Sequence, residues 1–137
     1  MVKNIVKDTM FLMQKSQPAS KADIQTARDL LDTLRANSEI CVGLAANMIG
    51  VRKRIIAVQV GIMPVAMINP VITSHSQQSY ETEEGCLSHT GTRKTTRWQS
   101  VEVEYYDINF IKHKNTYTDF TAQIIQHEID HCNGILI

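Results

Sequence analysis

The chain has 137 residues, with 14 Lys and Arg against 14 Asp and Glu, which gives no formal net charge. This length suits one domain with its own core, so we expect a single domain over residues 1–137. The balanced charge does not indicate a nucleic-acid or membrane-surface partner, because both favour basic patches, and no apolar run reaches the roughly 20 residues that cross a bilayer.

Residues 1–10 have neither a long apolar core nor a small-residue cleavage site, so we expect no signal peptide. Three cysteines are too few, and odd in number, for a disulfide framework. They favour a reducing compartment, and we expect the protein in the cytoplasm.

The first strong element is an amphipathic helix over residues 20–37. Ser20 can cap its start, and Asp23 suits the positive end of the helix dipole. Apolar residues recur at helical spacing along one face; they are Ile24, Ala27, Leu30, Leu31 and Leu34.

Three later segments predict strands. Residues 54–60 form a short β-branched run typical of a buried strand, and residues 64–73 predict a second strand. Pro70 within the second indicates a sheet edge or a break. Residues 100–110 alternate apolar and polar side chains, which predicts a half-buried antiparallel strand; its inner face holds Val101, Val103 and Tyr105.

The last element is a helix over residues 119–134, with Thr118 or Asp119 as its cap and Gly134 as its stop. The order of helix, strands and helix favours an α+β fold over alternating βαβ units.

Two histidines on this last helix form the pattern H-E-x-x-H. His127 and His131 lie roughly 40° apart around the helix, so both imidazoles can reach one ion. Glu128 flanks that position and suits a base that takes a proton from an activated water. Asp130, on the other flank, can hold a histidine or an arginine. A solvated helix face with two chance histidines is the alternative, but the surrounding residues are apolar and buried imidazoles need partners.

A third ligand has to come from upstream, because no His, Asp or Glu follows His131. Cys132 points about 100° away from its neighbour and is expected in the core. Cys86, within "ETEEGCLS", is favoured because a thiolate binds zinc or iron(II) strongly. His89 remains open, as do Cys41 and several carboxylates, whereas polar, loop-like surroundings predict exposed positions for His75 and His113.

Three ordered segments resemble the peptide deformylase family. "GLAANMIG" (43–50), "EEGCLS" (83–88) and "QHEIDH" (126–131) follow the family motifs G-x-G-x-A-A-x-Q, E-G-C-L-S and Q-H-E-x-D-H, and the last two match in full. The chain ends at Ile137 and in this resembles the shorter, Gram-positive-like members.

The resemblance implies an α+β fold in which antiparallel strands surround a central helix with the two histidines. It implies hydrolysis of the formyl group from formyl-methionyl peptides or nascent chains at the ribosome. The implied ligands of one divalent ion are Cys86, His127 and His131, with iron(II) expected and zinc or nickel as alternatives.

The resemblance also assigns roles around the ion. Glu128 matches the general acid and base, the N–H of Leu87 an oxyanion donor, and Gly43 the glycine whose backbone meets the substrate. Arg93 matches an arginine near the peptide-binding cleft, and Arg97 is expected to pair with Asp130.

The first motif departs from the family at two positions. Cys41 replaces its opening glycine, and Met48 replaces the glutamine whose amide donates to the formyl oxygen. A thioether cannot donate, so Met48 either packs beside a weakened site or marks a hydrolase of another N-acyl group. Asn47 is a possible replacement donor. A non-catalytic protein that binds metal or nascent chains is a third interpretation, which the retention of Glu128 disfavours.

Overall fold

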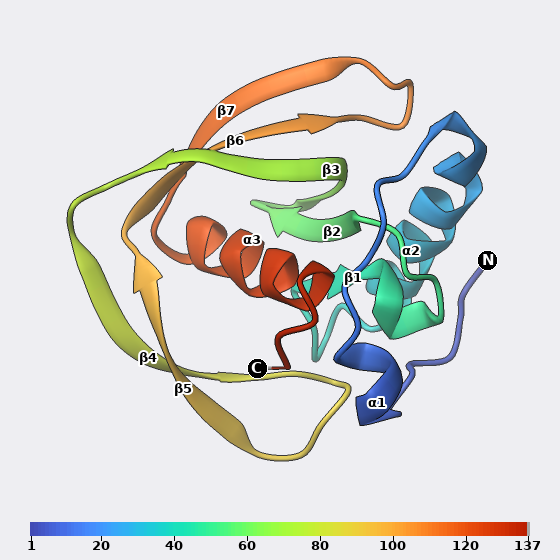
Figure 1. The fold of residues 1–137 in the computed structure, drawn as a ribbon, viewed down its shortest axis with the longest axis horizontal. Coiled ribbons are helices and arrows are strands. Elements are labelled where there is room, and N and C mark those ends of the chain that lie inside the picture. Colours follow the sequence, from blue (N-terminus) through green and yellow to red (C-terminus); the bar gives the residue numbers. More distant parts are fainter. Residues whose placement is uncertain (137) are drawn as a thin grey trace.

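The computed structural model describes residues 1–136, in which a five-stranded sheet and a two-stranded ribbon surround the last helix (Figure 1). All strand pairs are antiparallel. The sheet has the order β1 (Gly43–Ala45), β2 (Ile55–Val60), β3 (Met63–His75), β6 (Ser100–Tyr106) and β7 (Lys112–Thr118), and the ribbon pairs β4 (Ser79–Gly85) with β5 (Thr92–Trp98). The helices are α1 (Thr9–Leu12), α2 (Ile24–Ala36) and α3 (Asp119–Cys132), with 3₁₀ turns at Lys21–Asp23 and Ala46–Ile49.

This architecture confirms the predicted α+β fold, with antiparallel strands around the histidine-bearing helix α3. The resemblance to shorter members of the family was based on the end of the chain at Ile137, and this residue lies outside the described residues.

The first predicted helix begins with a 3₁₀ turn. Ser20 and Asp23 form a reciprocal capping box, in which Ser20 Oγ accepts from Ala22 N at 3.2 Å and Asp23 Oδ2 accepts from Ser20 N at 2.8 Å. The α-helix proper begins one residue later, at Ile24, so the predicted cap is confirmed but acts on the 3₁₀ turn.

The last helix has the predicted stop but a weaker start. Gly134 follows the helix with a φ of 76°, a left-handed conformation that glycine adopts at little cost. Thr118 occupies the N-cap position, but its side chain makes no capping hydrogen bond.

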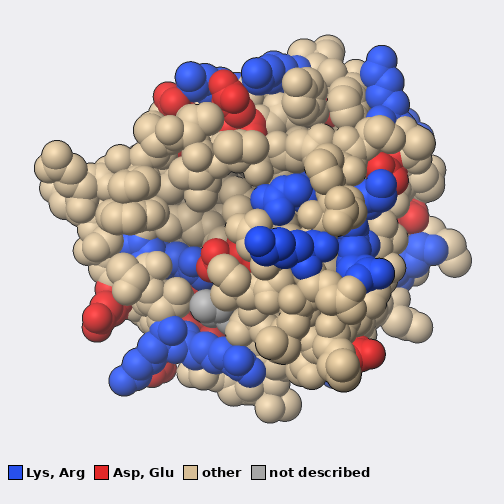
Figure 2. Space-filling view, in the orientation of Figure 1, with Lys and Arg blue, Asp and Glu red and all other residues tan. Residues whose placement is uncertain are grey.

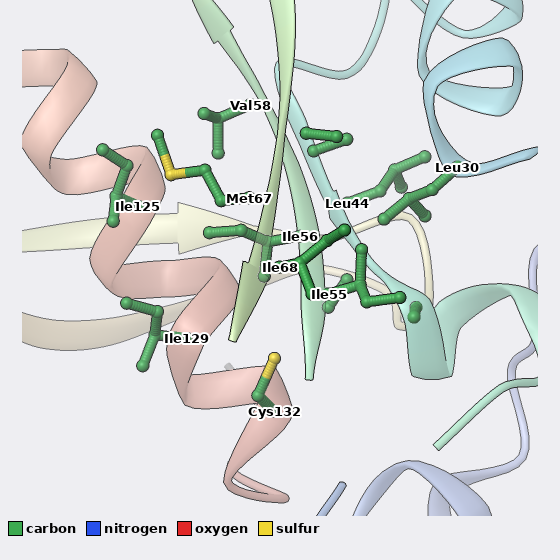
Figure 3. Packing of buried hydrophobic residues seen from close by; sticks show 14 of the residues in the cluster. Leu30, Leu44, Ile55, Ile56, Val58, Met67, Ile68, Ile125, Ile129 and Cys132 are labelled. Atoms are coloured by element: carbon green, nitrogen blue, oxygen red, sulfur yellow. The ribbon is translucent and has the colours of Figure 1, made fainter. Parts of the chain in front are cut away.

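Strand β2 explains how the core is layered. Four consecutive residues, Ile55 to Val58, are fully buried, which requires cover on both faces of the strand. Figure 3 shows Ile125 and Ile129 of α3 on one side of the strands and Leu30 of α2 on the other. Helix α3 therefore lies in the core, where its buried polar residues need defined partners.

Pro70 lies in the part of β3 that follows its pairing with β2, which ends at Ile68. Among the described residues it therefore has a strand neighbour only on the β6 side, as at a sheet edge, and the predicted break is also present. The register with β6 shifts between Ile68 and Val71, and this bulge removes the imino nitrogen of Pro70 from the hydrogen-bond ladder. Asn69, in the same bulge at a φ of 52°, bonds through its side chain to both backbone groups of Ala19.

His113 was expected in an exposed loop but lies in strand β7. Its Nε2 is 2.7 Å from Asp107 Oδ2, and its ring stacks on Tyr105 at 5.2 Å between centroids. The segment is polar, and it forms a strand because β6 supplies its backbone partners. His75 is exposed as expected, at the end of β3, and stacks on Trp98 at 3.7 Å.

Charge is unevenly spread over the surface despite the net value of zero. Figure 2 shows a band of Lys and Arg side chains across the middle of this face, whereas Asp and Glu are scattered. Among residues 1–136, no helix combines the length and apolar character needed to span a membrane.

Candidate metal centre

Three donor side chains converge beside α3. One ligand atom each from Cys86, His127 and His131 lies within 4.8 Å of the other two. The two Nε2 atoms are 2.9 Å apart, and Cys86 Sγ is 3.5 Å from His131 Nε2. The histidines are one turn apart on α3, and Cys86 follows the end of β4, so a helix and the ribbon bring together residues 45 positions apart.

A buried carboxylate orients the first histidine. His127 Nδ1 donates to Glu84 Oε1 at 2.7 Å, which turns Nε2 of the same ring toward Cys86 and His131. Glu84 also accepts from Arg97 through both oxygens, at 2.6 and 2.9 Å. Burial alone would raise the pKa of Glu84, but the hydrogen bonds from Arg97 and His127 outweigh it and lower that pKa to about 2.

Arg97 links this carboxylate to a second position on α3, about one turn after His127. Its Nη1 donates to Asp130 Oδ2 at 2.6 Å, which confirms the predicted pair of Arg97 and Asp130. Asp130 therefore holds an arginine rather than a histidine. The sequence interpretation missed Glu84, although it lies two residues before Cys86 in a quoted motif; its burial beside an arginine depends on the fold.

The two histidines have opposite proton affinities when only protein groups surround them. Burial lowers the pKa of His127, but hydrogen bonds with Cys86 and Glu84 and the charge of Glu128 raise it overall, to about 10. Burial and the charge of His127 lower the pKa of His131 to about 3. One proton therefore stays with the pair at neutral pH.

Glu128 faces a cavity of about 480 Å³ that is also lined by two of the three donors, Cys86 and His127. The side chain is 4% exposed, and burial raises its pKa to about 7. Its Oε1 is buried without a hydrogen-bond partner among residues 1–136. Apolar residues supply much of the cavity wall; they are Ile40, Val42, Met48, Leu87, Phe120 and Ile124.

Gly43 lies against the carboxylate of Glu128. A Cβ at this position would be 2.8 Å from Glu128 Oε2 and 2.7 Å from Ile124 Cγ2. Any larger residue would displace Glu128 or the helix that carries it, so the close approach of β1 to α3 requires glycine.

The structure places Leu87 and Met48 in the cavity wall. The backbone N–H of Leu87 makes no hydrogen bond within the described part of the chain. Met48 is 1% exposed, and its sulfur lies 3.5 Å from Ala45 N. Cys41 also borders the cavity, but its thiol donates to Gly43 O at 2.9 Å.

Asn47 and Arg93 are not brought to the cavity. Asn47 Nδ2 donates to His131 O at 3.0 Å and Leu12 O at 3.4 Å, so its amide is turned away from the site. Arg93 is exposed at the start of β5 and donates to Leu136 O at 3.1 Å. Its assignment to substrate binding stays a prediction.

The donor set fits a divalent metal ion. A thiolate and two imidazoles are ligands that zinc, iron(II) and nickel accept. The partnerless Glu128 Oε1 beside them provides an acceptor for a water at the same place. His89, the alternative ligand, instead has Nδ1 3.3 Å from Thr90 O and is not part of the convergent group. Cys132 is buried in the core, as expected.

Comparison with known proteins gives consistent matches. The sequence profile of the family described as polypeptide deformylase matches residues 2–137. A peptide deformylase from Clostridium beijerinckii is 59% identical over 137 residues, all of both chains, and one from Synechocystis is 34% identical over 91% of this chain and 71% of its own length.

Two solved structures share the fold. A class I type b peptide deformylase from Acinetobacter baumannii, crystallised with Met-Ala-Ser bound, superposes with a TM-score of 0.89 and 29% identity, covering 99% of this chain and 97% of its own. The peptide deformylase of Thermotoga maritima gives a TM-score of 0.88 and 28% identity, with 99% and 95% covered.

Proposed function

The chain belongs to the peptide deformylase family, metallohydrolases that remove the N-terminal formyl group from nascent polypeptides, and from this premise we propose how its own residues perform the reaction. The observation that carries the proposal is the buried Glu128 beside three convergent metal donors. Nascent chains are made in the cytoplasm, so we place the protein there, with its substrate supplied at the ribosome.

Cys86, His127 and His131 would hold the ion, with Glu84 fixing the ring of His127. When bound, a divalent ion supplies a Lewis acid that polarises the formyl oxygen and lowers the pKa of a water. We take iron(II) as the native ion, with zinc and nickel as the alternatives that this donor set also accepts.

Glu128 moves the proton. Its Oε1 accepts a proton from the water as the water oxygen bonds to the formyl carbon, and the carboxyl group then donates that proton to the leaving amine nitrogen. The C–N bond breaks, giving formate and a free N-terminal amine. In the protein without an ion, burial raises the pKa of Glu128 to about 7, and a carboxylate held in a buried position can take up and return one proton.

The backbone around Glu128 positions the formyl group. The free N–H of Leu87 is available to the negative charge that develops on the formyl oxygen. Gly43 brings the backbone of β1 directly against Glu128, where a substrate peptide can lie beside the strand.

The apolar part of the cavity accommodates the methionine side chain. Its wall includes Val42, Leu87 and Ile124, and it opens next to His127 and Glu128. The Met-Ala-Ser bound to the Acinetobacter relative corresponds to the peptide that remains once a formyl group has been removed from formyl-Met-Ala-Ser.

Formate release from formyl-Met-Ala-Ser tests the proposal. Protein loaded without oxygen with iron(II), zinc or nickel should release formate from this peptide. The rate of acetyl-Met-Ala-Ser hydrolysis, measured separately, tests the alternative N-acyl substrate. Glu128→Ala should lower kcat by about 10²–10⁴ while keeping the ion. Glu81→Ala, which removes an exposed carboxylate on β4, is the matched control.

Absence of formate release with all three ions would reject the proposal. Faster hydrolysis of the acetyl peptide than of the formyl peptide would instead support the interpretation of Met48 as the mark of another N-acyl substrate.

A further inference from the structure

The apolar cavity beside the metal donors contains one amide side chain, that of Gln123. It comes from the first turns of α3 and is partly buried. Across the cavity wall, Tyr80 of β4 donates its hydroxyl hydrogen to Gln123 Oε1 at 2.9 Å. Residues 43 positions apart in sequence thus meet in one hydrogen bond at the cavity.

In this arrangement the tyrosine hydroxyl donates to the amide carbonyl oxygen, which leaves Nε2 of Gln123 with two N–H donors for other partners. Within residues 1–136, Nε2 has no hydrogen-bond partner and is not among the buried partnerless atoms, so it remains accessible. An accessible donor in the wall of a cavity is available to a ligand.

Apart from the metal donors Cys86 and His127, the other polar side chains of the cavity are already committed or lack a donor. The thiol of Cys41 donates to Gly43 O, and the carboxylate of Glu84 accepts from His127 and Arg97. Glu83 and Glu128 carry no donor hydrogen when ionised. Gln123 is therefore the side chain of this wall, among the described residues, that offers an uncommitted amide donor.

We propose that Gln123 is a specificity-determining residue that donates a hydrogen bond from Nε2 to the thioether sulfur of the N-terminal methionine, with Tyr80 as its positioning residue. The inference rests on the proposed function, which places the methionine side chain in this cavity. The sulfur is the only polar atom of that side chain, and it accepts but cannot donate. A donor held by Tyr80 complements it, whereas an apolar wall would only match its shape.

Norleucine isolates the proposed contact. It replaces the sulfur by a methylene group and keeps the length of the side chain, so it fills the same space without an acceptor. The discriminating quantity is the ratio of kcat/KM for formyl-Met-Ala-Ser to kcat/KM for the same peptide with norleucine in place of methionine. A net hydrogen bond to a weak acceptor corresponds to a factor of about two to ten in this ratio.

Gln123→Leu should lower the ratio by about two- to tenfold relative to the unsubstituted enzyme. Tyr80→Phe removes only the hydroxyl that holds the amide of Gln123, so the amide can rotate. We therefore expect a smaller drop in the ratio, of about twofold. Gln25→Leu makes the same substitution at an exposed position on α2 and should leave the ratio unchanged.

A ratio in Gln123→Leu equal to that of the unsubstituted enzyme would overturn the proposal. A drop in Gln123→Leu without any change in Tyr80→Phe would overturn the positioning role of Tyr80. Turnover of both peptides with an unchanged ratio rejects this inference alone, whereas no formate from either peptide rejects the proposed function on which it rests.

Discussion

Glu84 Oε1 lies 2.7 Å from His127 Nδ1, and the same carboxylate accepts two hydrogen bonds from Arg97. The carboxylate therefore fixes the ring orientation of His127, so that Nε2 faces the metal position and presents a lone pair there once its proton has left. Because Arg97 is also bonded to Asp130, one chain of ion pairs connects the ribbon to two positions on α3, His127 and Asp130, that lie about one turn apart.

We expect Glu84→Gln to weaken metal binding by about 10- to 100-fold, since partners of a ligating histidine typically have effects of this size. The amide keeps the shape of the side chain but loses the charge that holds His127 and Arg97. Competition with a chelator of known affinity measures the change. Glu83→Gln, one residue earlier and exposed, should bind metal as the unsubstituted protein does; equal affinities in both variants would show that Glu84 does not support the ligand.

The same carboxylate makes metal-stripped protein sensitive to acid. The pKa of Glu84 is lowered from 4.5 to about 2 in the folded state, so its ionised form stabilises the fold above pH 4.5, and this contribution disappears as the pH falls toward 2. Glu84→Gln should cost about 3 kcal/mol at pH 7, the size expected when a buried ion pair loses one partner, and about half as much at pH 3. Urea unfolding at both pH values measures the two differences; a constant difference would contradict the linkage.

The sequence predicted best those elements whose signals are local. Helix α2 and strand β6 were recognised because burial follows the period of each element, as Val101 and Val103 show. The ribbon of β4 and β5 was missed because most of its residues are exposed and no apolar alternation marks them. Its strands are defined by pairing with each other, which no single segment reveals.

The residues of the candidate site show the same difference between those with a local sequence signal and those brought into place by packing. His127 and His131 were predicted from helical geometry, and Cys86 was favoured over His89 for its thiolate before the family resemblance completed the ligand set. Glu84 could not be recognised, because a carboxylate becomes a buried partner of His127 only once β4 lies against α3. Contacts between distant segments are set by packing rather than by local spacing.

Two cysteines on either side of the histidines provide a direct test of the ligand set. Cys86→Ala should lose most bound metal, because it removes one of three convergent donors. Cys132→Ala should retain the metal but destabilise the fold by about 1 kcal/mol, because it removes a buried sulfur from the core. Metal analysis after gel filtration, combined with thermal unfolding, distinguishes the two effects. Equal metal content in both variants would reject Cys86 as a ligand.

Metal uptake should release a proton from the histidine pair. Hydrogen bonds and nearby negative charge raise the pKa of His127 to about 10, so metal-stripped protein carries that proton at neutral pH, whereas a ligating imidazole must be free of it at Nε2. Affinity should therefore rise about tenfold per pH unit between pH 6 and 8 for each proton released. Zinc titrations by calorimetry in buffers of different ionisation enthalpy count the protons. A pH-independent affinity with no proton release would contradict the assignment.

Met48→Gln tests whether the site lacks an oxyanion donor. Met48 is buried in the cavity wall and its sulfur accepts from Ala45 N, so it offers no hydrogen to the formyl oxygen. If that absence limits the rate, a glutamine amide at this position should raise kcat, by up to about 10²–10³, with little change in KM.

Met48→Leu is the matched control, because it keeps an apolar side chain of similar size and adds no donor. Its kcat should equal that of the unsubstituted enzyme, measured by formate release from formyl-Met-Ala-Ser with iron(II). An unchanged or lower kcat in Met48→Gln would mean that the existing donors are sufficient. The Leu87 N–H, which has no partner in the described part of the chain, would then supply the stabilisation that the amide was expected to add.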